Sequence, residues 1–337
     1  MTAKKSYVNL SAGRIALSIL KYGLLLALTV VALVPFVWMI SSSLKTSIDV
    51  FSVPMKWIPT EFHWDNYLKI WERVPLLVYF KNTAVVAIIV TFMQILTSSF
   101  AAYAFAKMQF RGRDLLFMCY IGTIAVPWQV YMVPQFIMMR SIGLYDTIWA
   151  LVVLQSFTAF GVFLMRQFYL GIPNDLSEAA RIDGLSEYGI WARIILPLAK
   201  PAIATLCIFT FVNTWNDYMG PMIYLTTDIK KTIQVGLRRF IQAYSADYNL
   251  IMAASLCSLL PVTIVFLFSH ENAVLIREVG LRIKFVAALH HVPHHRVPHE
   301  HRVEHGKLVV LKVVLAQHRQ AFAGAHLHRA FRGVELA

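Results

Sequence analysis

The sequence predicts an all-α membrane protein with six transmembrane helices, and three observations support this fold class. The chain of 337 residues is 58% hydrophobic and only 15% charged, and its mean hydropathy is +0.59. Soluble domains carry about 25% charged residues. Six apolar runs approach the roughly 20 residues that a helix needs to cross about 30 Å of hydrocarbon. A polar, helix-forming insert at 170–200 separates two of the runs.

The six apolar runs divide the chain into three regions. Residues 1–18 form an N-terminal segment, 19–269 a six-helix domain, and 270–337 an atypical basic tail rich in histidine. The first run is longer than the roughly 7–15-residue core of a signal peptide and no convincing cleavage site follows it, so we expect a retained span. The predicted spans are Ile19–Ile40, Thr83–Ala106, Leu115–Met138, Thr147–Phe168, Ala202–Leu225 and Tyr248–Ser269.

Charge and cysteine content exclude other classes but barely orient the chain. The formal net charge is +13, and the cations sit mostly in loops between apolar runs and in the tail. This distribution favours membrane-flanking cations over nucleic-acid binding. Both sets of loops carry cations in similar number, so the positive-inside rule alone does not decide the orientation. The three cysteines lie inside apolar runs without metal-ligand spacing and are interpreted as small core residues.

The segment 41–80 is long, aromatic and interrupted by prolines. Trp57, Trp64 and Trp71 follow one another at intervals of seven residues. A helix from about Trp64 to Arg73 would place aromatic rings on one face. An interfacial belt helix is the favoured interpretation. A landing surface for an extracytoplasmic partner is the alternative.

The insert at 170–200 has the signals of two short helices joined by a tight turn. Asp175 and Glu178 have the spacing of a capping box, which predicts a helix beginning at this point. Gly184 suits a left-handed residue at its C-terminal end. Ser186 is predicted to cap a second helix that ends before Pro197. The sequence therefore predicts a compact helix–turn–helix knob.

The same insert carries a pattern of seven fixed positions, which reads E-A-A, three residues, G, nine residues, I-x-L-P. With residue frequencies of about 5–10%, its chance occurrence is roughly 10⁻⁷ to 10⁻⁹ per register. The pattern resembles the cytoplasmic loop by which permeases of bacterial ABC importers dock onto their ATPase subunits. The resemblance implies the type I importer permease fold with this insert as coupling loop. The residues implied in ATPase coupling are Glu178, Ala179, Ala180, Asp183, Gly184, Ile194, Leu196 and Pro197.

Further motifs extend the resemblance over about residues 10–268. They include Ala101–Ala106, Phe110–Arg113 and Thr214–Asp217, which are similar to the carbohydrate branch of these permeases, of the maltose and glycerol-phosphate type. The resemblance implies an inner-membrane subunit with both termini in the cytoplasm. Its implied partners are a second homologous permease, two copies of a cytoplasmic ATP-binding subunit and an extracytoplasmic solute-binding protein.

The resemblance also implies that this chain is a transport subunit and not an enzyme. The sequence contains no G-x-x-x-x-G-K-[ST] phosphate loop, so no cofactor is expected on this chain and ATP with Mg²⁺ is assigned to the partner ATPase. The expected function is half of the membrane path for a sugar or related polyol, operated by alternating access. A phosphorylated polyol is the alternative solute.

Polar residues inside the spans are candidates for the solute path, because ionisable or amide groups are costly to expose to lipid and therefore face protein or a water-filled path. Amides and carboxylates bond sugar hydroxyls, and aromatic rings stack on sugar faces. Contacts between neighbouring helices are the alternative role. The candidates are Asn213, Trp215, Asn216, Asp217 and Tyr218, with Gln129 and Gln155 as weaker ones.

The tail at 270–337 contains every histidine except His63, and the resemblance stops near Phe268. A late frameshift that replaces the native end is the favoured interpretation. A disordered basic tail near anionic lipid is a second one. A metal-binding regulatory tail is a third and would make the chain a metal-responsive membrane protein, although we assign no metal ligand.

Overall fold

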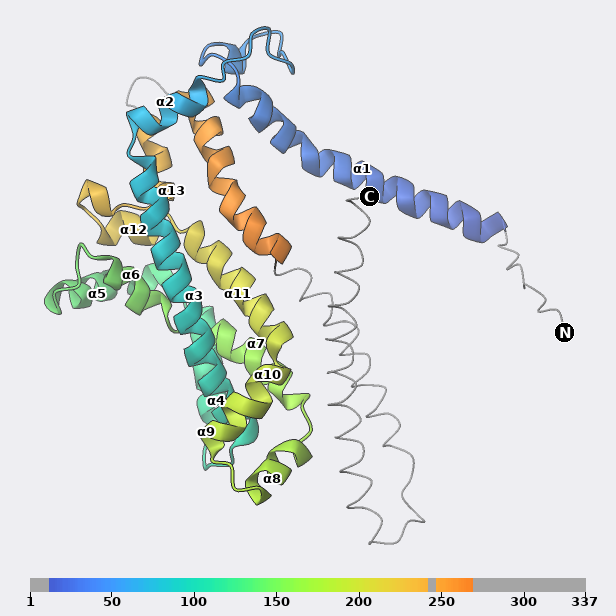
Figure 1. The fold of residues 1–337 in the computed structure, drawn as a ribbon, viewed down its shortest axis with the longest axis vertical. Helices are drawn as coiled ribbons and strands as arrows, with labels where there is room; N and C mark the ends of the chain where they lie inside the picture. Colours follow the sequence, from blue (N-terminus) through green and yellow to red (C-terminus); the bar gives the residue numbers. More distant parts are fainter. Residues whose placement is uncertain (1–11, 242–246, 269–337) are drawn as a thin grey trace, which may run out of the picture. The chain divides into compact units, whose positions relative to one another are not determined.

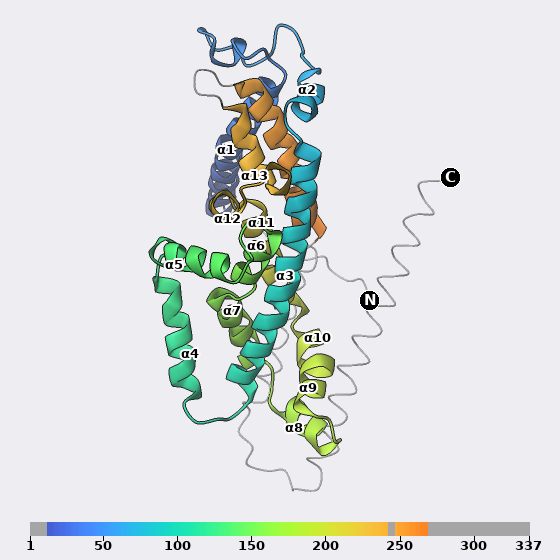
Figure 2. The ribbon, with the colours of Figure 1, turned by 90° about the vertical axis from the view of Figure 1, so that its left-hand side faces the viewer.

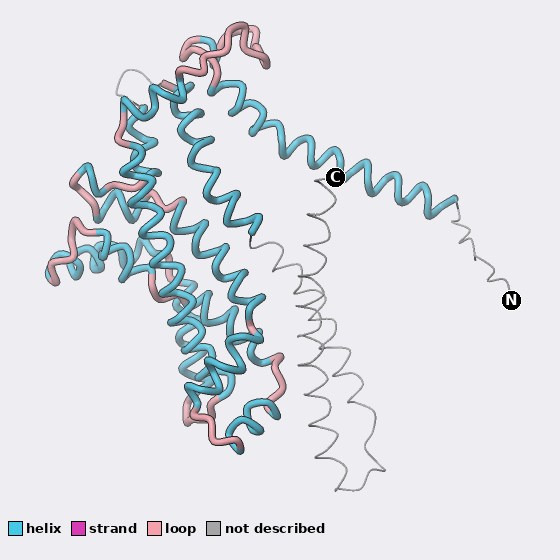
Figure 3. Tube along the Cα trace, in the orientation of Figure 1, coloured by secondary structure: helices cyan, strands magenta, loops and turns pink. Residues whose placement is uncertain are grey.

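The structure, a computed structural model, describes residues 12–241 and 247–268 (Figure 1). Helices make up most of this part of the chain, and it contains no β-strand, as Figure 3 shows. The predictions for residues 1–11 and for the tail lie outside the described residues. The all-α prediction is confirmed for the remainder.

Three helices are long and apolar enough to cross a membrane without interruption. They are Leu17–Ser43 within α1 (Ala12–Ser43), α3 (Leu76–Lys107) and the helix Tyr248–Phe268. The most apolar window of α1 has no buried residue, and every residue from 17 to 37 is exposed.

Three further candidate spans are bent pairs of helices, which gives six if each pair crosses once. The first pair bends by 98° and the second by 41°. The third pair joins a helical run at 187–198 to α11 (Lys200–Trp215) and bends by 79°. The first two pairs comprise α4 (Arg113–Gly122) with the 3₁₀ turn Thr123–Ala125 and α5 (Trp128–Ser141), and α6 (Ile148–Gln155) with α7 (Ala159–Leu170).

The prediction of continuous third, fourth and fifth spans is therefore wrong, and local chemistry explains the breaks. Pro127 follows the first pair's break, and the residue before a proline is driven to extended backbone, as observed for Val126. The predicted fifth span stops at Trp215. The helix resumes as α12 (Met219–Tyr224). The two helices therefore begin at Lys200 and end at Tyr224, whereas the predicted span was Ala202–Leu225.

The break between α6 and α7 leaves carbonyl groups without the N–H donors of a continuous helix. Side chains of α3 donate hydrogen bonds to these carbonyls instead. The Gln94 amide Nε2 donates to the Gln155 carbonyl at 2.6 Å. The Thr97 hydroxyl donates to the Ser156 carbonyl at 2.8 Å. Because hydrocarbon offers no water to such groups, these two bonds make the break tolerable inside a span.

Helix α3 packs lengthwise against α7 and α11 (Figures 1 and 2). At its C-terminal end, buried apolar side chains from all three helices form one cluster that includes Ala102, Val162 and Leu206. At its N-terminal end, Leu76 and Tyr79 pack in a second cluster with Trp215 of α11. Both ends of α3 are thereby fixed to neighbouring helices.

Short elements surround the N-terminal end of α3. They are the 3₁₀ turns Asp49–Phe51, Asp228–Lys230 and Arg238–Phe240, and the helices α2 (Asn66–Arg73) and α13 (Ile233–Leu237). The predicted aromatic helix begins only at Asn66, so Trp64 precedes it and Trp57 lies in a loop against Trp38. The three tryptophans therefore do not share one helical face.

Gly161 permits the close contact of α7 with α3. A Cβ atom at this position would lie 2.4 Å from Ser98 Oγ and 2.7 Å from Thr158 Cγ2. We predict that Gly161→Ala lowers the free energy of unfolding by about 1–3 kcal/mol, because a well-packed interface must shift. The thermal unfolding midpoint in mild detergent measures the change.

Gly23→Ala is the matched control, because a Cβ atom there meets nothing within 4 Å. Adding Ser98→Ala to Gly161→Ala should recover part of the loss, since it removes the nearest clashing atom. An unchanged midpoint for Gly161→Ala would contradict the packing described.

Candidate functional site

The insert at 170–200 forms the predicted knob at the C-terminal end of α3 (Figure 2). Helix α8 (Asp175–Ile182) is followed by Gly184 with φ of +82°, so the left-handed assignment is confirmed. The Ser186 hydroxyl accepts from the Gly189 amide at 3.3 Å and caps α9 (Glu187–Ile190), which is also as predicted.

The predicted capping box at the start of α8 is wrong. Asn174 occupies the N-cap position without a side-chain cap, and Asp175 is the first helical residue. The Asn174 side chain is committed elsewhere, because its Oδ1 accepts from Lys107 Nζ at 2.9 Å.

The prediction that the second helix ends before Pro197 is also wrong. Helix α9 continues through a π-helical turn at Trp191–Ile195 into α10 (Leu196–Leu198). A π turn is closed by i→i+5 hydrogen bonds, so it accommodates one more residue than an α-helical turn. Proline has no backbone N–H, and the first turn of α10 tolerates this because its N–H groups need no helical acceptor. Ile194 and Leu198 pack against the buried cluster of α3, α7 and α11.

The exposed residues of α8 and the following turn differ from the predicted coupling set at Ala180 and Ile182. Glu178, Ala179 and Asp183 are exposed, as is Gly184, whereas Ala180 is buried against the chain's own core. Ile182 is 87% exposed although it is a large apolar residue. Sequence analysis missed Ile182, although an isoleucine four residues after Glu178 in a polar helix was a usable signal.

Leu196 is half-buried and Pro197 is exposed, so the final part of the seven-position pattern lies partly at the surface. Ile194 contributes instead to packing. The pattern therefore combines exposed positions on α8 with positions that anchor α9 and α10.

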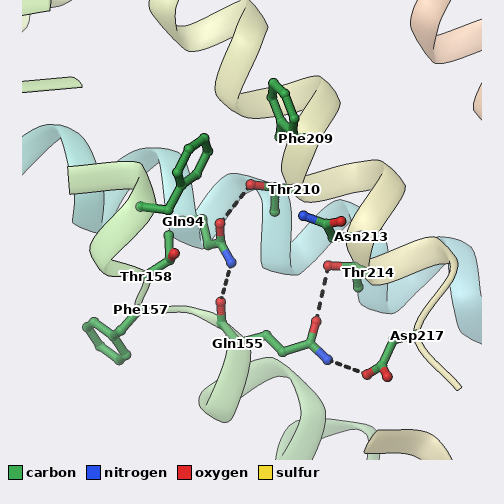
Figure 4. A pocket seen from close by; sticks show the side chains of 10 residues that line it. Gln94, Gln155, Phe157, Thr158, Phe209, Thr210, Asn213, Thr214 and Asp217 are labelled. Atoms are coloured by element: carbon green, nitrogen blue, oxygen red, sulfur yellow. Dashed lines mark hydrogen bonds between the residues drawn. The ribbon is translucent and has the colours of Figure 1, made fainter. Parts of the chain in front are cut away.

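A polar cavity of about 420 Å³ lies where two helix breaks meet (Figure 4). One break follows α6 and the other follows α11, and α3 closes the side between them. Amide, hydroxyl and carboxylate groups share the lining with aromatic rings. The lining residues are Gln94, Gln155, Phe157, Thr158, Phe160, Phe209, Thr210, Asn213, Thr214 and Asp217.

Most polar groups of this cavity bond to one another. The Thr210 hydroxyl donates to Gln94 Oε1 at 2.7 Å. The Thr214 hydroxyl donates to Gln155 Oε1 at 3.1 Å, and Gln155 Nε2 donates to Asp217 Oδ2 at 2.8 Å. Asp217 Oδ1 also accepts from the Gly220 amide at 3.1 Å, which joins this network to the start of α12.

Asn213 is different because its side chain is exposed and has no hydrogen-bond partner among residues 12–241 and 247–268. An unpaired amide in a polar cavity can both donate to and accept from a ligand. The phenyl rings of Phe157, Phe160 and Phe209 lie in the same lining. The cavity can therefore offer hydrogen bonds and apolar contact to one solute.

The structure brings together only some of the predicted path residues. Gln155, Asn213 and Asp217 line the cavity. Trp215 is buried on the other side of α11, where its Nε1 donates to the Ser258 carbonyl at 3.1 Å. The remaining candidates lie outside the lining: Asn216 accepts from Gln234, Tyr218 is half-buried, and Gln129 is exposed on α5.

Gln94, Thr210 and Thr214 were not among the predicted path residues. Gln94 is an amide in an apolar run, which was a usable signal. The threonines gave none, because threonine is common in transmembrane helices, where its hydroxyl can bond the chain's own carbonyls. No group of three or more possible metal ligands occurs among the described residues.

The chain is similar to known transport proteins. The family model for "Binding-protein-dependent transport system inner membrane component" matches residues 94–273. A probable ABC transporter permease, YurM of Bacillus subtilis, is 32% identical over 70% of this chain and 79% of the relative. The arabinooligosaccharide transport permease AraQ of the same organism is 31% identical over 77% and 92%.

Two further similarities concern function and fold. The diacetylchitobiose uptake permease NgcG of Streptomyces coelicolor is 28% identical over 73% of this chain and 83% of the relative. A chain of a bacterial ABC transporter involved in alginate import matches with a TM-score of 0.68 over 80% of this chain and 99% of that chain. The TM-score shows a shared fold, and at 23% sequence identity the similarity is one of fold alone.

Asp217 is predicted to stabilise the cavity wall. Asp217→Ala removes the acceptor for both Gln155 and Gly220 and leaves two donors without partners, so we expect a loss of about 1–3 kcal/mol in unfolding free energy. The thermal midpoint in detergent measures it.

Asp175→Ala is the control, because Asp175 is exposed at the start of α8. An equal midpoint shift for the two variants would argue against the bonds described for Asp217.

Proposed function

This chain belongs to the family of binding-protein-dependent transport system inner membrane components, and from that premise we propose that it forms half of the path of an ATP-driven importer for a sugar or related polyol. Its proposed partners are an extracytoplasmic solute-binding protein, a second homologous permease and two copies of a cytoplasmic ATPase subunit. Similarity to binding-protein-dependent permeases supports the first of these partners most directly.

The cavity supports a sugar most strongly. Sugar recognition needs hydrogen-bonding groups for hydroxyls and apolar rings for the faces of the pyranose or furanose. The unpaired Asn213 amide lines the same cavity as three phenylalanines, and together these groups meet both needs. The relatives named above for arabinooligosaccharides and diacetylchitobiose point to the same solute class.

A phosphorylated polyol fits the cavity less well. The described lining includes the carboxylate of Asp217 and no lysine or arginine. Asp217 accepts hydrogen bonds from Gln155 and Gly220 but has no cationic partner among the described residues, so its charge would repel a phosphate. Binding sites for phosphate generally supply cations or backbone amides. A neutral sugar carries no such penalty.

The knob is proposed to be the contact with the ATPase. Its exposed residues Glu178, Ala179 and Ile182 lie on one side of α8, and the exposed Asp183 and Gly184 follow the helix directly. A small alanine permits close approach, and Ile182 gives the face an apolar centre of the kind found at protein interfaces. ATP and Mg²⁺ are proposed to reside on the ATPase, with the knob and both termini in the cytoplasm.

Alternating access is proposed to act through the breaks that form the cavity. The segments 156–158 and 216–218 lack regular helix and connect α6 to α7 and α11 to α12. Such interruptions absorb changes in backbone dihedrals while flanking helices move as rigid bodies. Movement of the knob by the ATPase would then change which side of the membrane the cavity faces.

Asn213→Ala is predicted to weaken solute handling, because it removes the one unpaired amide found in the described lining. We expect about a tenfold rise in KM for uptake, the effect of losing one or two hydrogen bonds. Uptake of labelled arabinooligosaccharides, diacetylchitobiose and lactose into cells tests a panel of three sugars.

Asn216→Ala is the matched control, an asparagine three residues away and outside the cavity. Equal KM values for both variants and the unmodified chain would remove Asn213 from the path. Uptake of none of the sugars would argue against the proposed solute class.

Gly184→Asp is predicted to uncouple transport from ATP hydrolysis while leaving the protein in the membrane. Aspartate tolerates left-handed backbone, so the substitution mainly adds a charge to the surface proposed to meet the ATPase. The measurement compares uptake with ATP hydrolysis in proteoliposomes.

Gly184→Asn is the control of similar shape and backbone tolerance without the charge. We expect it to retain more transport than Gly184→Asp. Normal transport by Gly184→Asp would refute the docking assignment.

A further inference from the structure

Two residues of α3 hold the two ends of the knob. Tyr103 and Lys107 are four residues apart and therefore lie on one face of the helix. Lys107 Nζ donates to the Ile172 carbonyl at 2.5 Å and to Asn174 Oδ1 at 2.9 Å. These bonds fix the chain where it enters α8.

The other end of α8 is fixed through a carboxylate. The Tyr103 hydroxyl donates to Glu187 Oε2 at 2.6 Å, and Arg181 Nε donates to Glu187 Oε1 at 2.6 Å. Glu187 thus joins the last turn of α8 to the start of α9 and both to α3. The exposed Arg181–Glu187 pair would contribute little alone. Tyr103 is only 4% exposed, so its bond to a charged acceptor is the stronger one.

Helix α3 leads from these contacts to the cavity without a break. Gln94 lies nine residues before Tyr103, about 13–14 Å along a helix that rises 1.5 Å per residue. Near the opposite end, Asn82 Nδ2 donates to the carbonyls of Ile229 and Lys231 at 2.8 and 2.9 Å. An unbroken helix transmits displacement along its axis because its backbone bonds resist extension.

The chain segments before and after the knob also lead to the cavity, but through α7 and α11 and not through α3. Towards the N-terminus the chain runs through α7 to the break at 156–158. Towards the C-terminus it passes the π turn at Trp191–Ile195 and the 79° bend before α11. Both routes reach Gln94 only through its hydrogen bonds with Gln155 and Thr210, because Gln94 belongs to α3.

We propose that Tyr103 and Lys107 are positioning residues that fasten the coupling loop to α3, so that displacement of the knob moves Gln94 and the cavity wall directly. This inference rests on the proposed function. It assigns the transmission of the ATPase-driven movement to α3, a helix that does not precede or follow the knob directly in the chain. Both residues act through the loop and touch no nucleotide.

The test uses Asn213→Cys as a reporter in a chain whose native cysteines, Cys119, Cys207 and Cys257, are replaced by serine. The complex with its ATPase is reconstituted in proteoliposomes. The rate at which a methanethiosulfonate reagent modifies the reporter is measured with and without MgATP, which needs no knowledge of the sugar. The ratio of the two rates reports movement at the cavity.

Tyr103→Phe and Lys107→Met are each expected to reduce the effect of MgATP on this rate about tenfold, the consequence of losing hydrogen bonds in which one partner is charged. ATP hydrolysis should continue. Lys107→Arg, which retains a donor, should restore the response. The control is Tyr120→Phe, which removes a hydroxyl from a tyrosine packed against the same core cluster but outside these contacts.

A full MgATP effect in both Tyr103→Phe and Lys107→Met would overturn the proposal. So would a loss of assembled complex and of ATP hydrolysis in parallel with the response, since that pattern indicates a purely structural role. No MgATP effect in the reporter chain itself would instead refute the proposed function, and the inference would fall with it.

Discussion

Helix α3 supplies the hydrogen-bond donors that a broken span requires, and much of the structure depends on them. The carbonyls of Gln155 and Ser156 lose their helical donors at the break between α6 and α7, and Gln94 and Thr97 replace those donors. In hydrocarbon an unpaired carbonyl costs several kcal/mol, so the break can exist only where such side chains reach it. The position of the cavity follows from this requirement.

The same amide groups link stability to function. Gln94 binds both the broken segment and Thr210, while Gln155 binds Thr214 and Asp217. Most of the cavity's polar groups therefore form hydrogen bonds between neighbouring helices, which was the alternative role considered for polar residues inside the spans. Asn213 remains available to a solute. A wall that changes partners as helices move can change shape without burying unpaired groups, which suits a path that opens alternately to two sides.

The sequence predicted features set by local rules better than those set by packing. Gly184 and Ser186 were correctly placed because a left-handed residue and a helix cap depend on nearby residues. Asp175 failed as a cap because the helix begins one residue earlier, and a distant lysine engages the side chain of Asn174, which takes the N-cap position. The spans were recognised by hydropathy, but hydropathy averages over a break. Trp215 and Asn213 are two residues apart on one helix, and only tertiary contacts reveal that one faces the core and the other the cavity.

The central claim is that this chain is one half of a membrane path driven by a separate ATPase. Purification from native membranes in mild detergent, followed by mass spectrometry of the associated proteins, tests it most directly. The account predicts recovery of an ATP-binding subunit and a second permease of the same family, together with a solute-binding protein after cross-linking. Recovery of this chain without an ATPase, from membranes in which that ATPase is present, would contradict it.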